Sequence, residues 1–157
     1  MKYTICALAL AAFGIAGNVS AETSNSELDP KDPAQQTRLI TKVVTKELAH
    51  LEQKRPGLTS KFIDALDCET HNSRDGLITH LHPDGTLVKN VGDDGTVESG
   101  SGAAGYGQFM PEHFGRDHRW GVNLVDYRDQ AKYAAILIEY RIEKGQNALQ
   151  DWYPCLS

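Results

Sequence analysis

The chain has 157 residues, 24% of them charged, and a formal net charge of −5 at pH 7. Nucleic-acid binding calls for a basic face, so this charge balance argues against a nucleic-acid partner. The length suits one domain with its own hydrophobic core and is too short for two.

The N-terminal residues predict a secretory signal peptide. Lys2 precedes an apolar run over residues 3–16, and Val19-Ser20-Ala21 has the small-x-small pattern of a cleavage site. The run is too short and too poorly flanked for a membrane span. We therefore expect residues 1–21 to be removed on export to the periplasm or the medium, without stable membrane insertion. A retained signal anchor is the alternative.

Two cysteines remain once Cys6 has left with the signal peptide. An even number in an exported chain predicts one disulfide, between Cys68 and Cys155. Two reduced, unrelated cysteines are the alternative. In the chain-entropy model a bridge over so long a loop stabilises the fold by about 4 to 5 kcal/mol.

Residues 22–32 are polar and predict a flexible leader, after which one domain is expected over residues 33–157. Asp32 and Pro33 offer an N-cap and a proline at the first helical position. Apolar residues then follow at helical spacing, which predicts an amphipathic helix over residues 33–53.

A shorter second helix is expected next, capped by Thr59 or Ser60 and ending near residues 68–70. Its predicted buried residues are Phe62, Ile63 and Leu66. Short runs rich in β-branched residues then alternate with two Asp-Gly turns, over residues 77–98. This pattern predicts a small antiparallel meander of two or three strands.

The last third of the chain begins with a glycine-rich stretch over residues 100–107, and Pro111 could open a short helix through Phe114. Asp126 then caps a long helix that stops at Gly145. The expected inner stripe of this helix consists of Ala131, Ala134, Ala135, Ile138 and Ile142.

Glu69 is the first candidate for chemistry. It ends an apolar helix and precedes a region rich in polar residues and glycine. Apolar surroundings disfavour the charged form of a carboxyl, so its pKa rises and it can act as an acid near neutral pH. A solvated glutamate at a helix end is the alternative.

Four segments resemble a known family. Residues 65–70, Ala-Leu-Asp-Cys-Glu-Thr, resemble the Cys-Glu-Ser segment around the catalytic glutamate of lysozyme-like and lytic transglycosylase domains. Residues 105–111, Gly-Tyr-Gly-Gln-Phe-Met-Pro, resemble a segment of the membrane-bound lytic transglycosylases. Residues 123–134 are similar to the family's Asn-Leu-x-Asp motif and the helix after it. Trp152 and Cys155 match the end of small exported members, in which the last cysteine pairs with the one before the glutamate.

The resemblance implies an α+β, lysozyme-like fold, mainly α-helical, with a small antiparallel meander flanking a substrate cleft. It also implies cleavage of the β-1,4 bond between MurNAc and GlcNAc in peptidoglycan, without cofactor or metal. Glu69 would protonate the leaving oxygen. It would then take the proton of the muramyl C6 hydroxyl as that oxygen attacks C1, leaving a 1,6-anhydromuramyl end.

The resemblance gives supporting roles to residues near the motifs. The expected substrate-binding residues are Thr70, Gly105, Tyr106, Gln108 and Tyr133. The glycines, Gly107 included, would let the backbone approach the glycan, and Gln108 would offer an amide. The two tyrosines would stack on sugar rings or donate a hydroxyl near Glu69. A flexible surface loop and two core tyrosines are the alternatives.

Two features depart from the family pattern. Thr70 stands where serine is usual, which keeps a hydroxyl. The Ala-Tyr-Asn-Ala-Gly segment after the long helix of many soluble members is absent, so Tyr133 or Tyr106 must replace its tyrosine, or activity is weaker. A second carboxylate within residues 75–98 would make the protein a true lysozyme, although turn chemistry explains Asp84 and Asp94.

His80 and His82 would share one strand face, but a metal site would need a further ligand from elsewhere, so we expect surface hairpin residues. A non-catalytic peptidoglycan-binding module is the alternative to an enzyme, and retention of Glu69 favours the enzyme. Wall turnover, a path for a secretion machine or pilus assembly, and killing of competitors are all compatible with the sequence.

Overall fold

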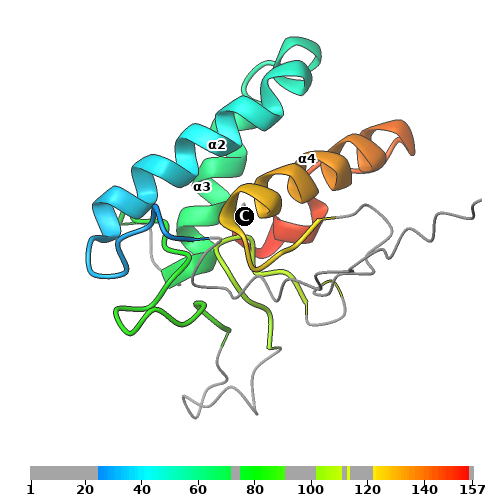
Figure 1. Ribbon diagram of the computed structural model, residues 1–157. Helices are drawn as coiled ribbons and strands as arrows, with labels where there is room; N and C mark the ends of the chain where they lie inside the picture. Colours follow the sequence, from blue (N-terminus) through cyan, green and yellow to red (C-terminus); the bar gives the residue numbers. More distant parts are fainter. Residues whose placement is uncertain (1–24, 72–74, 91–101, 111–112, 114–121, 156–157) are drawn as a thin grey trace, which may run out of the picture.

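The computed structural model describes residues 25–71, 75–90, 102–110, 113 and 122–155. In this part the protein is mainly α-helical, with α2 (Pro33–Lys54), α3 (Leu58–His71), α4 (Tyr127–Glu143) and a closing 3-10 helix, η2 (Gln150–Cys155). α2 packs against both α3 and α4, and η2 packs against α3 (Figure 1). The predominantly helical fold expected from the sequence is confirmed.

α2 forms where the sequence predicts it. The Asp32 carboxylate accepts a hydrogen bond from the N–H of Gln35 at 2.9 Å, and Pro33 is the first helical residue. This arrangement satisfies one of the free N–H groups at the helix start. The buried face of α2 consists of Gln36, Ile40, Val44, Leu48 and Leu51.

The start of α3 differs from the prediction, which assigned its cap to Thr59 or Ser60. The cap is supplied by Glu52 of the preceding helix, whose carboxylate accepts hydrogen bonds from the N–H groups of Gly57 at 2.6 Å and Thr59 at 2.7 Å. These bonds lower the pKa of Glu52. A carboxylate beside the positive end of a helix dipole is favourable, so α2 and α3 are joined by a shared cap.

α4 confirms the prediction for the last third of the chain. The Asp126 carboxylate accepts a hydrogen bond from the N–H of Arg128 at 2.8 Å, and Gly145, with φ +68°, follows the helix end. The predicted inner stripe is buried or packed against the core. The buried face also includes three residues outside that stripe, namely Tyr127, Gln130 and Tyr133.

The predicted meander is reduced, in the described residues, to a turn with isolated bridges. Leu81 pairs with Leu87 across a turn in which the N–H of Gly85 donates to the His82 carbonyl at 2.8 Å. Ala104 pairs with both Lys89 and Phe109. No longer strand occurs in this part of the chain, because loop atoms bond to helix side chains instead: the N–H of Ile78 donates to Thr37 Oγ1 at 2.9 Å. The expected third strand lies outside the described residues.

The leader expected over residues 22–32 is described from residue 25, and that portion is packed on the domain. Leu28 belongs to the hydrophobic core. The Asn25 side chain donates to the Val125 carbonyl at 2.8 Å and accepts from the N–H of Tyr127 at 3.1 Å. Glu27 forms an ion pair with Arg128 at 2.7 Å. These contacts hold the N-terminal segment against the start of α4.

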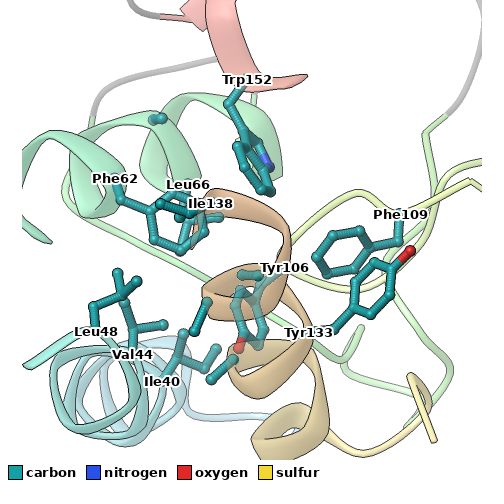
Figure 2. Packing of buried hydrophobic residues seen from close by; sticks show 14 of the residues in the cluster. Ile40, Val44, Leu48, Phe62, Leu66, Tyr106, Phe109, Tyr133, Ile138 and Trp152 are labelled. Carbon is teal, nitrogen blue, oxygen red and sulfur yellow. The ribbon is translucent and has the colours of Figure 1, made fainter. Parts of the chain in front are cut away.

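The hydrophobic core lies between the helices and is rich in aromatic rings. Trp152 of η2 meets Phe62 of α3 edge-on, with ring centroids 4.7 Å apart, and Phe109 meets Tyr133 of α4 edge-on at 4.9 Å (Figure 2). Edge-to-face pairs of this kind add to the free energy gained by burial. The predicted signal peptide lies outside the described residues. Among the helices that are described, none has the length and apolar character needed to cross a bilayer.

Candidate functional site

Glu69 lies in the last turn of α3, three residues beyond the fully buried Leu66. Its side chain is half-buried, and this burial raises the pKa of the carboxyl. Among the described residues, no cation or hydrogen-bond donor counteracts that shift. A carboxyl in this condition keeps its proton to higher pH than a solvated glutamate does. The sequence context of Glu69 predicted a carboxyl with a raised pKa, and the direction of the shift agrees with this prediction.

Cys68 immediately precedes Glu69 in α3 and is a disulfide cysteine in the structure. The side chains of Cys155 and Thr70 lie outside the described part. The pairing of Cys68 with Cys155 therefore remains a prediction, as does the role of Thr70. The contact between α3 and η2, which carry the two cysteines, supports the pairing.

Residues 105–108 form a tight turn closed by the pairing of Ala104 with Phe109, whose N–H and carbonyl groups exchange hydrogen bonds of 2.9 and 3.2 Å. The Gly105 N–H donates to the Val88 carbonyl at 2.7 Å. From the other side, the indole Nε1–H of Trp152 donates to the Gly107 carbonyl at 3.1 Å. The turn is thus fixed by contacts to two separate segments, and is not a flexible surface loop.

The two glycines of this turn face the protein interior. A Cβ on Gly105 would lie 2.0 Å from Nε2 of Gln130, and a Cβ on Gly107 would lie 2.4 Å from the ring of Phe109. Gly105 also has φ +72°, which favours glycine. The close approach that requires these glycines within the protein is therefore to Gln130 and Phe109, while their expected approach to a glycan stays a prediction.

Gln108 is the residue of the turn that reaches the surface. Its backbone has φ +49°, a left-handed conformation that is uncommon for a residue other than glycine. Its Nε2 donates to the Gly105 carbonyl at 2.7 Å. Gln108 lines a pocket of about 240 Å³ that also includes Met110, His113 and Arg141. A strained backbone beside a pocket is typical of binding sites.

The two candidate tyrosines are both fully buried. The Tyr106 hydroxyl donates to the Tyr127 carbonyl at 2.9 Å, which leaves its ring no exposed face for a sugar. The Tyr133 ring packs on Phe109, and its hydroxyl shares a hydrogen bond with Nδ1 of His113, a residue of the pocket. Tyr106 is placed as a core residue, whereas Tyr133 has its hydroxyl at the pocket side of the core.

His80 differs from the expectation of a surface hairpin residue, while His82 is exposed as expected. The His80 ring is fully buried, with Nε2 bonded to the Val125 carbonyl at 2.9 Å, and Nδ1 has no hydrogen-bond partner within the part of the chain that the structure describes. Burial lowers its pKa to about 4. The described residues contain no cluster of three or more His, Cys, Asp and Glu side chains suited to a metal ion.

Reasoning from the sequence missed Gln130, which lies in the middle of these contacts and is fully buried. The available signal was its position four residues before Ala134 and eight before Ile138, which places a polar side chain on the buried face of α4. A buried amide must find hydrogen-bond partners. A glutamine on the buried face of a helix therefore indicates that its side chain bonds to the backbone of a neighbouring loop.

Comparison with known protein families, with curated proteins and with solved structures finds no match for this chain.

Proposed function

We propose that the protein is a lytic transglycosylase that cleaves the MurNAc–GlcNAc bond of peptidoglycan, with Glu69 as acid and then base. The observation that carries the proposal is the half-buried Glu69 at the end of α3, whose pKa is raised by burial. The resemblance of residues 65–70 and 105–111 to this class of enzyme supports it, and so does a mainly helical fold of the expected element order.

The chemistry needs one carboxyl that can hold a proton and then take one back. In its neutral form Glu69 protonates the glycosidic oxygen as the bond to C1 breaks. The resulting carboxylate then accepts the proton of the C6 hydroxyl while that oxygen bonds to C1, so the ring closes and Glu69 is regenerated. Because the attacking group belongs to the substrate, no second carboxylate is required.

A true lysozyme is the second candidate and would need a further carboxylate near the scissile bond. Asp84 is exposed and its carboxylate accepts hydrogen bonds from the N–H and hydroxyl of Thr86 at 3.0 and 2.6 Å, which accounts for it as a turn residue. Asp75 accepts from the N–H of Leu77 at 3.0 Å in the same manner. Neither contact favours a catalytic role for Asp84 or Asp75, and the remaining candidates, Asp93, Asp94 and Glu98, lie outside the described residues. We prefer the single-glutamate mechanism because it needs none of them.

We expect Glu69→Gln to abolish release of soluble fragments from purified murein sacculi while leaving the thermal midpoint nearly unchanged, because Gln keeps the shape and loses the transferable proton. Mass spectrometry of the wild-type products identifies the reaction. Anhydromuramyl ends indicate a transglycosylase, and reducing ends indicate a lysozyme. Intact sacculi with bound protein indicate a binding module and contradict the proposal.

Glu143→Gln is the matched control, since it makes the same chemical change at an exposed position on α4. This variant should cleave at the wild-type rate. Retention of more than a few per cent of the wild-type rate in Glu69→Gln would show that Glu69 is not the acid.

A further inference from the structure

Two fully buried glutamines each bind a loop to a helix. On α2, Oε1 of Gln36 accepts hydrogen bonds from the N–H groups of His80 at 2.9 Å and Leu81 at 3.0 Å. On α4, Oε1 of Gln130 accepts from the N–H of Gly107 at 3.1 Å. Both side chains are completely shielded from solvent, so each amide replaces water as the partner of loop backbone.

The contacts of Gln130 join three segments of the chain. Besides accepting from Gly107, its amide donates through Nε2 to the Leu124 carbonyl at 2.8 Å and to the Ala104 carbonyl at 3.4 Å. It therefore holds the entry to α4 and both sides of the turn at residues 105–108. Within the turn, the Tyr106 hydroxyl also reaches α4 by donating to the Tyr127 carbonyl at 2.9 Å, but among the described residues only Gln130 bonds to the N–H of Gly107, next to Gln108.

The turn is shaped to admit this amide. The absence of a Cβ at Gly105 leaves the space that Nε2 of Gln130 occupies, since a Cβ would come within 2.0 Å of it. The residue after Gly107 is Gln108, which has the strained backbone and lines the pocket. Because Gly107 and Gln108 are joined by one peptide bond, the hydrogen bond from the Gly107 N–H to Gln130 also constrains the backbone of Gln108.

We propose that Gln130 is a positioning residue for the cleavage reaction: it sets the place of the turn and thereby the orientation of Gln108 toward the glycan. This inference rests on the proposed function. Gln130 touches no substrate, being buried, and acts only through the turn. Misplacing a substrate-contacting group by a fraction of a bond length lowers the efficiency of an enzyme far more than it lowers its stability.

Gln36 supplies the matched control. It has the same side chain, the same complete burial and a similar set of hydrogen bonds to backbone, but it holds residues 80 and 81 and not the turn. Replacement of either glutamine by Met keeps the approximate volume and leaves buried backbone groups without partners, so both variants should lose thermal stability to a similar extent.

The test compares Gln130→Met and Gln36→Met on soluble glycan strands, at a temperature at which circular dichroism shows both to be folded. We expect Gln130→Met to lower kcat/KM by about ten-fold or more relative to Gln36→Met, with a rise in KM. Gln130→Glu should lie closer to the wild type, because a buried neutral acid keeps the acceptor and one donor. Hydrogen exchange at the Gly107 amide should accelerate in Gln130→Met and not in Gln36→Met.

The outcomes separate the two proposals. If the wild-type protein releases no product, the proposed function fails, and this inference fails with it. If the wild type is active and the two Met variants lose efficiency equally and in proportion to their thermal midpoints, only the positioning role of Gln130 is overturned. Should Gln130→Met not fold, the same comparison is made between Gln130→Asn and Gln36→Asn, because the side chain that is shorter by one methylene draws the amide away from its partners while it stays polar.

Discussion

The left-handed backbone of Gln108 is the clearest residue-scale sign of a site that packing alone does not explain. Any residue with a Cβ is destabilised in this conformation by about 1 to 2 kcal/mol relative to glycine. Its side chain nevertheless closes on the Gly105 carbonyl and lines the pocket. The motif at residues 105–111 made Gln108 a candidate, but its backbone conformation could not be predicted from the sequence, because glutamine has no local preference for the left-handed region.

We expect two substitutions at Gln108 to separate strain from function. Gln108→Ala loses the hydrogen bond and keeps the strain, so it should lower the free energy of unfolding by about 1 kcal/mol. Gln108→Gly also relieves the strain and should be about 1 kcal/mol more stable than the alanine variant. Both should lower cleavage by roughly ten- to hundredfold. The measurements are urea unfolding and product release.

The Gln108→Gly variant tests whether the Gln108 side chain contacts substrate, because it removes the side chain without a large loss of stability. A protein with Gln108→Gly that is as stable as the wild type and cleaves equally well would show that this side chain does not contact substrate. Loss of activity only in step with stability would assign the turn a purely structural role.

At the scale of elements, capping residues and apolar spacing predicted where the helices lie. Contacts between distant segments determine the cap of α3 and the structure of the predicted strands. Asp32 and Asp126 cap their helices as their sequence context indicates. The cap of α3 comes from Glu52, one helix earlier, and the predicted strands are replaced by bonds to side chains such as Thr37. Sequence pattern does not report such partners, because it carries no information about which helix a loop will meet.

Gly107→Ala should destabilise the fold by roughly 1 to 3 kcal/mol, because the new methyl would overlap the buried ring of Phe109. Gly145→Ala is the control: its Cβ would meet open space and only its φ of +68° is unfavourable, so its loss should be near 1 kcal/mol. Thermal unfolding of both variants checks the order. Equal stabilities would show that the turn can shift away from Phe109.

At the scale of the whole molecule, buried polar groups connect the helices through the loops. Gln36 binds the backbone of His80, and the His80 ring binds the Val125 carbonyl just before α4. The sequence analysis did not predict the burial of Gln36, although this residue lies four positions before Ile40 on the buried face of α2. Nothing in the alternating pattern of residues 77–82 predicted a core histidine. His80 is buried because its segment is bonded to Gln36 of α2 and to Val125 before α4. Local sequence preference does not determine this burial.

His80 should make the stability depend on pH. The histidine of the unfolded chain has a pKa near 6.5, whereas burial lowers that of the folded protein to about 4. Between these values the unfolded state binds more protons, so the free energy of unfolding falls as the pH drops from 6.5 and levels off below 4. The total loss from this group is about 3 kcal/mol.

Urea unfolding at pH 7, 5 and 4 checks this, with His80→Gln as the comparison. The variant should be less stable at pH 7 and lose less on acidification, because carboxylates such as Glu52 contribute equally to both proteins and cancel in the difference. Parallel pH profiles for the two proteins would show that His80 is not buried as described.

The contact of Asn25 and Glu27 with the start of α4 has a consequence for how the chain is made. Hydrogen bonds there join positions 100 to 102 residues apart, so they cannot form until most of the chain has left the ribosome. At a synthesis rate of about 5 to 20 residues per second, the early segment waits roughly 5 to 20 seconds for its partner. Such distant pairing also slows the search for the native arrangement. The N-terminal segment therefore docks only after the start of α4 has been made, although it is synthesised before the rest of the domain.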